Sequence, residues 1–527
     1  MSKLRFSALA ASILVGVAGA CQSPTYPSAG APSADADADS GGKPRAGSGG
    51  KGGTAGNQRK PVNAGRLGDA GENGASFAAD GGTASESAPT TESRVTAGSG
   101  ASAGRVAEPS VPLAANSGGA PAVGGGNIDA SASAELFDQR SVVRFDITLP
   151  QASIDALAAA PDVYTPASLT YRDTTLPDVG VRIKGESSRR TLMQKAAFKI
   201  KTDEYVADQT LLGMKRITLN NMLSDDTYMA ECLAYHVWRR ARLPAPRCNH
   251  AVVYVNGTYY GVYAHVESED KTFLRRWFAS DDGNLYEDGM ADFVSGAASS
   301  FDLQTNEMVN DRSDLIALIS AIDSASSATY LQDLDAVLDT AHFLRFSALE
   351  AAVNQWDGYS YTYFEPNNFR IYHDPTTRKF TFLPWGHDLS MKAFKYVEAD
   401  RPAREYIPLF TRPLYENRSG ARDSGGRIFV GDRVGPRAAG GCLDSAECRS
   451  AYAEAAREII AVYEGADLRA LAQQTYELIR PHIYEESSSR REVSNADFEA
   501  AYQTLLGFIA GRAQAMREDL TEAGFTP

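Results

Sequence analysis

The sequence predicts an α+β domain, in which a β-rich N-terminal lobe precedes a mainly helical C-terminal lobe, behind a long disordered segment. Three observations lead to this prediction. Residues 22–135 hold 23 of the 46 glycines and no Trp. Between about 140 and 270, apolar and polar residues alternate as they do in strands. After residue 310, apolar residues recur mainly at the spacing of helices. The domain is therefore expected to cover residues 136–527.

The N-terminus has the features of an export signal. Lys3 and Arg5 precede the apolar run "FSALAASILVGVAGA", which ends at Cys21 and is short for a membrane span. "VAGAC" is similar to a bacterial lipobox, whose Cys is lipidated and becomes the mature N-terminus. The alternative is an ordinary signal peptide with an incidental Cys. We expect residues 1–20 to be a lipoprotein signal peptide and Cys21 to anchor the protein to a membrane, on the extracytoplasmic side of the cell envelope.

Residues 21–135 are expected to be a disordered linker. They are rich in Gly, Ala and Ser, and Phe77 is their only Phe. Such a segment cannot bury enough apolar surface to offset the entropy lost on ordering. The net charge of the whole chain is −14, which leaves no basic excess to neutralise phosphates and argues against a nucleic-acid partner.

The first half of the domain contains strand patterns and one helical pattern. The helix is predicted from "DDTYMAECLAYHVWRRARL", which has an acidic start and a basic last turn. Two apolar runs flank Asn256-Gly257, a strong signal for a β-hairpin. The strands predicted here are 142–149, 179–185, 195–202 and the two arms of the hairpin at 250–267.

The second half is predicted to be helical, with one more hairpin. The hairpin arms are "NNFRIYHD" and "KFTFLPW" on either side of "PTTR". The predicted helices are 314–323, 341–356 and most of 450–520.

Three polar residues follow one another along the sequence in an order that suggests phosphoryl transfer. Asp357 follows a helix, Asn368 opens the second hairpin, and Asp388 follows its last strand in "FLPWGHDLSM". Transfer from ATP needs a carboxylate near the attacking hydroxyl and oxygen ligands for magnesium. Protein kinases place these groups in the same order, with shorter spacings. The alternative is that Asp388 is a turn residue that caps its own backbone.

Basic residues on the predicted strands supply the opposite charge. Arg182, Lys184 and Lys199 alternate with apolar residues, so their side chains share strand faces. Kinase folds pair a strand Lys with phosphates and hold it with a helix Glu, a role that Glu231 fits. The alternative is a solvated strand face with local ion pairs.

Four cysteines remain besides Cys21. Cys442 and Cys448 in "CLDSAEC" are close enough for a small disulfide loop. Cys232 and Cys248 either pair or stay as buried thiols. Export makes disulfides plausible, but the sequence does not give the connectivity.

Several motifs together resemble one known family, the CotH kinases (spore-coat protein H kinases), over nearly all of 138–525. They are "VGVRIKGESS", "KAAFKIKTDEY", "LLGMKRITLNNMLSDDTYMAECLAY", "PAPRCNHAVVYVNGTYYGVYAHVE", "NQWDGY" and "NNFRIYHDPTTRKFTFLPWGHDLSM". The resemblance implies an atypical protein kinase-like fold that uses ATP with magnesium or manganese to phosphorylate Ser in a protein substrate. It implies that Asp357 is the catalytic acid-base and that Asn368 and Asp388 bind the metal.

The resemblance also suggests nucleotide-binding residues and shows one departure. Lys184 and Lys199 would bind phosphates with Glu231 beside them, and Glu267 would lie near the adenine. Many members read Pro-Trp-Asp-x-Asp, whereas Gly386 stands in place of the first acid here.

Two classes of function follow. The first is a membrane-tethered atypical Ser kinase; the alternative is a non-catalytic surface lipoprotein that uses the CotH fold as a binding or adhesion module. A metal-dependent hydrolase built on His373, Asp374, His387 and Asp388 is disfavoured, because these residues lack a known ligand spacing.

Overall fold

The computed structural model describes residues 132–527 except 186–187, 289, 363–365, 394–405 and 411–435. All of the described residues belong to one compact unit of the chain. The predicted signal peptide, the lipidation site Cys21 and nearly all of the predicted linker lie outside the described residues. The first described element is a 3-10 helix, η1 (Ser133–Phe137), which begins three residues before the predicted domain boundary.

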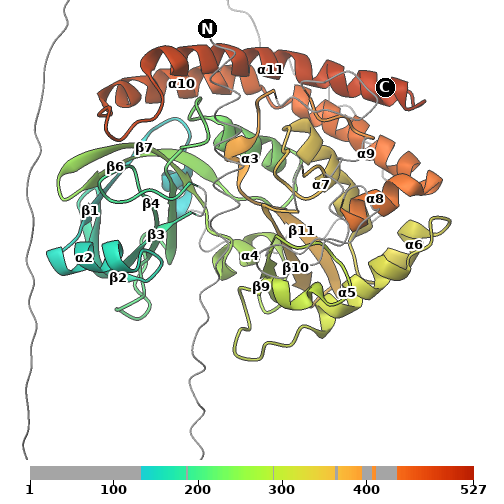
Figure 1. The fold of residues 1–527 in the computed structure, drawn as a ribbon, viewed down its shortest axis with the longest axis horizontal. Helices are drawn as coiled ribbons and strands as arrows, with labels where there is room; N and C mark the ends of the chain where they lie inside the picture. The colour runs from blue at the N-terminus through green and yellow to red at the C-terminus, as the bar shows by residue number, and fades with distance from the viewer. Residues whose placement is uncertain (1–131, 186–187, 289, 363–365, 394–405, 411–435) are drawn as a thin grey trace, which may run out of the picture. The chain divides into compact units, whose positions relative to one another are not determined.

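The N-terminal part is a closed β-barrel (Figure 1). Its strands follow the order β1-β2-β3-β4-β5-β7-β6, with β1 and β6 parallel and all other neighbours antiparallel. Alternate residues of each strand fill the interior, which explains the period-2 pattern of the sequence. The strands are β1 (Val143–Thr148), β2 (Thr165–Tyr171), β3 (Thr174–Lys184), β4 (Ala197–Lys201), β5 (Arg216–Asn220), β6 (Cys248–Val255) and β7 (Thr258–Val266).

Helices interrupt the barrel at two points. The predicted helix is α3 (Ala230–Arg240), and a shorter one that the pattern did not indicate, α2 (Gln151–Ala159), follows β1. The predicted hairpin is β6–β7. Its turn residues Asn256 and Gly257 both have positive φ, 49° and 76°, as a type I′ turn requires.

The C-terminal part combines a small sheet with helices. The sheet has the order β11-β10-β8-β9, and β10–β11 is the predicted second hairpin. Its strands are β8 (Asn284–Glu287), β9 (Asp302–Leu303), β10 (Phe369–Asp374) and β11 (Lys379–Pro384). The helices are α4 (Lys271–Trp277), α5 (Ser313–Ser324), α6 (Tyr330–Leu334), α7 (Thr340–Ala352), α8 (Arg437–Asp444), α9 (Ala446–Glu464), α10 (Leu468–Glu485) and α11 (Asn495–Glu522), with 3-10 turns η2 (Ala297–Ser300) and η3 (His387–Leu389). The predicted order of a β-rich lobe before a mainly helical one is confirmed.

An aromatic core fixes the second hairpin against α7. The ring of Phe382 on β11 lies 4.9 Å from that of Phe343, 5.0 Å from Tyr359 and 5.7 Å from Phe369, between centroids. Such offset and tilted pairs stabilise a core beyond the area that they bury. The loop after α7, which carries Tyr359, is therefore held together with the start of β10 and the end of β11. Asp357, Asn368 and Asp388 occur beside these three points.

The end of α10 is fixed to the barrel by a buried carboxylate. Glu486 accepts hydrogen bonds from Lys195 Nζ (2.9 Å) and from the backbone N–H of Val262 (2.6 Å). Gly261 makes room for it, since a Cβ there would lie 2.5 Å from Glu486 Cδ. Figure 1 shows α10 running along the barrel at β7. This buried ion pair joins the two parts of the domain on the side of α10.

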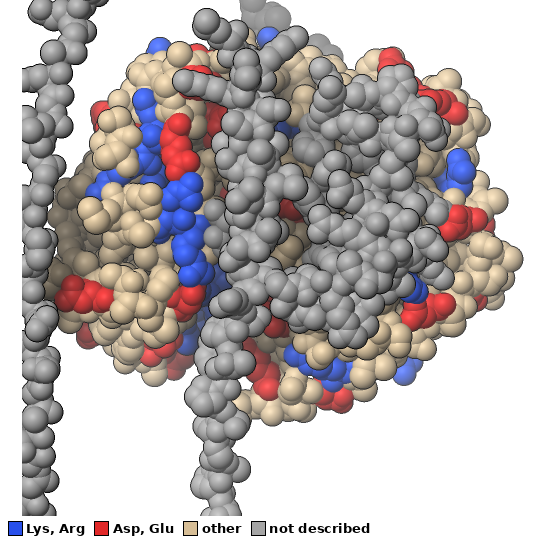
Figure 2. Space-filling view, viewed as in Figure 1, with Lys and Arg blue, Asp and Glu red and all other residues tan. Residues whose placement is uncertain are grey.

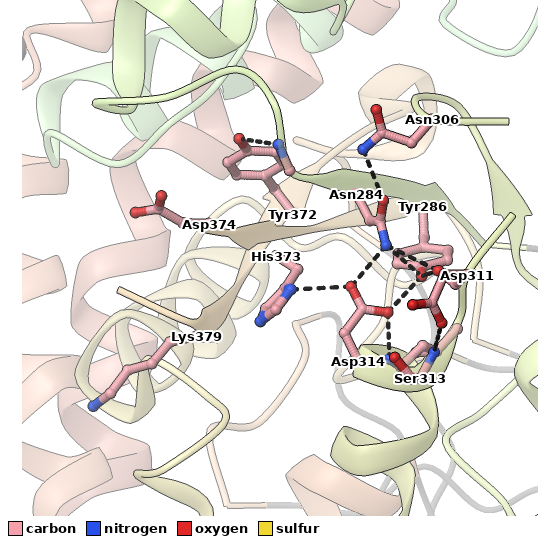
Figure 3. A network of polar contacts seen from close by, with 12 residues as sticks. Asn284, Tyr286, Asn306, Asp311, Ser313, Asp314, Tyr372, His373, Asp374 and Lys379 are labelled. Atoms are coloured by element: carbon pink, nitrogen blue, oxygen red, sulfur yellow. Dashed lines mark hydrogen bonds and ion pairs between the residues drawn. The ribbon is translucent and has the colours of Figure 1, made fainter. Parts of the chain in front are cut away.

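A second polar network joins α5 to the small sheet (Figure 3). Asp314, in the first turn of α5, accepts from Tyr286 Oη (2.7 Å) and Asn284 Nδ2 (2.9 Å) of β8. Its carboxylate also lies 3.0 Å from His373 Nδ1 of β10. The hydrogen bond to Asp314 raises the pKa of His373. His373 therefore has a structural partner in this network.

Two disulfides join neighbouring elements of the domain. The structure bridges Cys232 to Cys248, which ties α3 to β6, and Cys442 to Cys448, which ties α8 to α9. Figure 2 views the molecule from the same side as Figure 1 and shows Lys and Arg side chains gathered in a band over the barrel part. This band is present although the net charge of the chain is −14. No helix within the described ranges has the length and apolar character needed to cross a membrane.

Candidate active site

The structure brings Asp357 and Asn368 into direct contact. Asn368 Nδ2 donates to Asp357 Oδ2 (2.8 Å) and to the carbonyl oxygen of Asp357 (2.9 Å). Asn367 Nδ2 adds a longer contact to Oδ1 at 3.4 Å. Asn368 adopts the left-handed conformation, φ 52°, which Asn tolerates better than most residues. The Asp357 carboxylate is thus oriented by amides.

A buried carboxylate shapes the loop that carries Asp357. Helix α7 ends at Ala352, four residues before the predicted end, and Asn354 follows with φ 56°. Glu350, in the last turn of α7, accepts from the backbone N–H groups of Tyr359 (2.8 Å) and Ser360 (2.6 Å). The chain therefore turns back at Asp357 instead of continuing the helix.

The turn that carries Asp388 is bonded to the same loop. Gln355 Nε2 donates to the carbonyl oxygen of Gly386 (2.9 Å), and Ser390 Oγ donates to Gln355 Oε1 (3.2 Å). Within the described part of the chain, no hydrogen bond is formed by the Asp388 carboxylate, and it caps no backbone N–H of η3. The interpretation of Asp388 as a self-capping turn residue is therefore not supported by the geometry.

Asp357 has the proton affinity expected of a base that works near neutral pH. Burial raises its pKa to about 7, the negative charge of Asp388 acts in the same direction, and the hydrogen bonds from Asn367 and Asn368 oppose the rise. A general base is most effective when its pKa is near the working pH. The environment of Asp357 therefore suits proton transfer.

On the barrel side, Lys184 and Glu231 are joined through Asn220, which no sequence pattern indicated. Lys184 Nζ donates to Asn220 Oδ1. Asn220 Nδ2 donates to both oxygens of Glu231, at 2.9 and 2.8 Å. We had expected Glu231 to hold Lys184 directly. Instead, the Asn220 amide lies between them. Burial lowers the pKa of Lys184, while Glu231 and Asp388 act in the opposite direction.

The electrostatic couplings show that Glu231 also belongs to this cluster. Burial raises its pKa to about 8, and the charge of Asp388 contributes to the rise. The negative charge of Asp388 therefore acts to raise the pKa of Asp357 in the helical part and the pKa values of Lys184 and Glu231 in the barrel part. Of the predicted site residues, Asp357, Lys184 and Glu231 are therefore grouped around Asp388.

Lys199 lies at a second charged cluster beside the first. It pairs across the strands with Arg182, and burial lowers its pKa to about 7 while Glu287 opposes the shift. Arg370 bonds Glu287 through Nη2 (2.9 Å) and Glu269 through Nη1 (3.1 Å). The sequence offered no signal for Arg370, Glu287 or Glu269, because strands and loops far apart in the chain bring them together.

Trp385 forms a platform for two of these cations. The Arg370 guanidinium carbon lies 4.4 Å from the centroid of its ring, and Lys184 Nζ lies 5.8 Å away. Both distances are within the range of cation–π attraction. The Trp of "PWGHD" therefore links the two clusters, a role that the sequence analysis did not assign.

Glu267 lies outside this cluster. Its buried carboxylate accepts from Arg247 Nη2 (2.8 Å) and from Arg276 Nη2. Burial opposes its ionisation, but the two arginines lower its pKa. The structure thus engages Glu267 in ion pairs with Arg247 and Arg276, and its predicted place near an adenine stays a prediction.

The donor set fits a magnesium ion that arrives with a nucleotide. The Asp388 carboxylate has no hydrogen-bond donor among the described residues, and Asn368 turns its Nδ2 to Asp357, which leaves Oδ1 as an acceptor. Magnesium is commonly held by one or two carboxylates, substrate phosphates and waters. The described chain contains no group of three or more His, Cys, Asp or Glu placed to hold a metal by themselves.

Neither histidine of the hydrolase alternative is placed as a metal ligand. His373 pairs with Asp314. His387 is buried against Tyr235, with 5.0 Å between ring centroids, and burial lowers its pKa to about 3. The geometry therefore gives no support to the hydrolase interpretation.

Comparison with known proteins places these features in context. The family model described as CotH kinase protein matches residues 181–516. Inner spore coat protein H of Bacillus subtilis (strain 168) is 21% identical over 357 residues, which cover 65% of this chain and 88% of that protein. A crystal structure of the Helicobacter pylori proinflammatory kinase CtkA aligns with 69% of this chain and 94% of that chain, with 8% identity and a TM-score of 0.24.

Proposed function

This chain belongs to the CotH kinase family, and from that premise we propose that it is an atypical protein kinase which transfers the γ-phosphoryl group of ATP to a Ser hydroxyl of a protein substrate. One observation carries the proposal. Asp357 is oriented by Asn368 (2.8 Å), beside an Asp388 carboxylate with no hydrogen-bond donor among the described residues. A catalytic carboxylate next to an available metal ligand is what phosphoryl transfer requires.

In the proposed reaction, Asp357 accepts the proton of the Ser hydroxyl. The hydroxyl oxygen forms a bond to the γ-phosphorus, the bond from that phosphorus to the bridging oxygen breaks, and ADP leaves with the electron pair. Lys184 and Lys199 place positive charge beside the phosphates, a stabilisation that is strongest in a site shielded from water. Asn368 keeps the carboxylate of Asp357 oriented through the 2.8 Å hydrogen bond.

Asp388 and Asn368 are proposed to hold the divalent metal. A magnesium or manganese ion bound with ATP supplies charge neutralisation at the phosphates. Gly386, in place of a first acid, leaves Asp388 as the one carboxylate of "PWGHD". One carboxylate and an amide oxygen suffice where phosphates and water complete the coordination.

The proposal is tested by titration calorimetry with magnesium-ATP and by transfer of labelled phosphate to Ser-containing peptides. Asp388→Asn should weaken nucleotide binding and turnover together. Asp357→Asn should leave nucleotide affinity nearly intact while turnover falls roughly a hundredfold or more, the usual scale for a positioned acid-base group. If the wild type binds no nucleotide with magnesium or manganese, the kinase proposal fails. The non-catalytic binding or adhesion module then takes its place.

The location in the cell envelope is part of the proposal. It is supported by "VAGAC" at Cys21 and by two disulfides, Cys232–Cys248 and Cys442–Cys448, which are typical of exported proteins. Cys21→Ser should abolish acyl labelling and release the protein from membranes. A Cys21→Ser protein that stays membrane-bound, together with an unlabelled wild type, would refute the lipid anchor. A kinase in that location must receive its ATP outside the cytoplasm.

A further inference from the structure

One amide connects the barrel's candidate phosphate-binding lysine to the helix that follows it. Lys184 ends β3, Asn220 ends β5, and Glu231 lies in the first turn of α3. Lys184 Nζ donates to Asn220 Oδ1, and Asn220 Nδ2 donates to Glu231 at 2.9 and 2.8 Å. In the described structure, Lys184 and Glu231 form no direct ion pair. Asn220 is therefore the contact between them.

The hydrogen-bond chemistry requires a carboxamide at this position. A Lys ammonium can only donate, and Glu231 accepts from Asn220 Nδ2 at both of its oxygens. A residue between them must accept on one side and donate on the other, which the Asn220 oxygen and NH₂ group do in fixed directions. Asp at position 220 would accept from Lys184 but would place a second carboxylate against Glu231. Ala would leave both partners without their contact.

The neighbouring residue shows what a structural amide does in the same segment. Asn221 Nδ2 donates to the carbonyl oxygens of Ser188 (3.0 Å) and Lys195 (2.9 Å), so it holds the connection between β3 and β4. Among the described residues, its side chain forms no hydrogen bond with Lys184 or Glu231. Asn220 and Asn221 thus have the same side chain and adjacent positions but different partners, and Asn221 is a matched control.

We propose that Asn220 is a positioning residue for the kinase site, which orients the Lys184 ammonium toward the phosphates by linking it to Glu231, in place of a direct Lys–Glu ion pair. The proposal rests on the proposed function for its role in ATP use. Its structural core, that Asn220 holds Lys184, can be tested without ATP. The side-chain amide carries no charge, so it holds Lys184 without neutralising the ammonium that the phosphates would meet.

The first experiment measures the reactivity of Lys184 in the full protein without nucleotide. Purified protein is treated briefly with acetic anhydride, and acetylation of Lys184 is quantified by peptide mass spectrometry relative to Lys199. Asn220→Ala should raise the ratio severalfold, because the ammonium loses its acceptor. Asn220→Asp should lower it, because a negative charge then holds the ammonium. Asn221→Ala should leave the ratio unchanged.

A purely structural role predicts a different result. If Asn220 only supports the fold, both Asn220 variants loosen the protein and raise the labelling of Lys184 and Lys199 together. Changes of the same sign for Asn220→Ala and Asn220→Asp, or no change in the ratio, would overturn the proposal. The proposal is supported if the labelling ratio rises in Asn220→Ala, falls in Asn220→Asp and stays unchanged in Asn221→Ala. This result does not depend on whether the protein binds ATP.

The second experiment measures phosphotransfer kinetics. Asn220→Ala should raise the KM for ATP roughly tenfold and leave the KM for the peptide near the wild-type value. Combining it with Glu231→Ala should add little to either single change, since both break one connection. Full additivity of the two substitutions, or an unchanged KM for ATP in an active enzyme, counts against Asn220 as the link. An inactive wild type refutes the kinase proposal, and the labelling result then decides on Asn220.

Discussion

Substitution of Gly386 offers a sharp test of how the site is built. Gly386 has φ 58° and ψ 61°, a left-handed conformation that favours glycine. The side chain of Asn368 packs directly over it, so that a Cβ on residue 386 would lie 2.6 Å from Asn368 Cγ and closer still to Oδ1. Any side chain at position 386 must therefore move the amide that orients Asp357.

The cost of Gly386→Ala can be worked from these contacts. The left-handed conformation costs about 1 kcal/mol for a residue with a Cβ. Moving Asn368 breaks its bonds to Asp357 Oδ2 (2.8 Å) and to the Asp357 carbonyl oxygen (2.9 Å). A bond to a charged group contributes about 1.5 kcal/mol or more and a neutral one about 1 kcal/mol. We expect Gly386→Ala to lower the free energy of unfolding by about 3.5 kcal/mol.

Two other glycines separate the backbone cost from the collision. Gly257 and Gly296 have φ 76° and 87°, and a Cβ at either would meet nothing within 4 Å. Gly257→Ala and Gly296→Ala should each cost only about 1 kcal/mol in urea denaturation. Phosphotransfer should fall strongly in Gly386→Ala and stay intact in both controls. If Gly386→Ala costs no more than the controls and keeps its activity, the packing of Asn368 on Gly386 does not support Asp357.

The same reasoning bears on the departure from the family pattern. In the Pro-Trp-Asp-x-Asp pattern, an Asp stands at the position of Gly386. Gly386→Asp would introduce that acid into this chain. In this chain, its Cβ would displace Asn368, so the substitution should remove one proposed metal ligand while it adds another. We therefore expect Gly386→Asp to lose activity, and a gain in activity would contradict the geometry described here.

Three further predictions follow from buried charge. Since Asp357 must be ionised to accept a proton and its pKa is raised to about 7, the rate should rise with pH through about 7, and a flat profile from pH 5.5 to 8 would contradict its role. Asp314 raises the pKa of His373, so this pair stabilises the fold fully below the unfolded His pKa and loses its effect as pH rises through the higher folded value; the melting temperatures of wild type and His373→Gln should converge toward pH 9. Glu486→Gln leaves the buried Lys195 ammonium without its carboxylate and should cost about 3–5 kcal/mol, whereas a small loss by urea denaturation would show that water reaches the pair.

Local signals explain most of what the sequence predicted. Both hairpins were readable, because a two-residue Asn-Gly turn and a short polar turn separate their apolar arms. Asp357, Asn368 and Asp388 come together because consecutive elements tend to be neighbours in space. The early end of α7 also had a signal, since Asn354 belongs to a residue type that tolerates the left-handed conformation observed there, φ 56°.

The features that were missed depend on contacts between distant parts of the chain. Arg370 and Glu269 are 101 residues apart, and the parallel pairing of β1 with β6 closes the barrel across a similar separation. Periodicity reports the face of a strand but not its partner. Asn220 was missed for a related reason: its importance comes from lying between Lys184 and Glu231, which no local pattern shows.

The choice of partners for each acid accounts for the electrostatics of the site. An arginine beside a carboxylate lowers the pKa of that carboxylate, and Arg276 and Arg247 lower the pKa of Glu267 in this way. Asp357 is half-buried and its hydrogen bonds come from two Asn amides, and burial together with the charge of Asp388 raises its pKa to about 7. Amides orient a carboxylate without supplying a full positive charge. An amide partner therefore preserves the basicity that proton transfer needs, and replacing Asn368 with a cation would be expected to fix Asp357 in place while making it a weaker base.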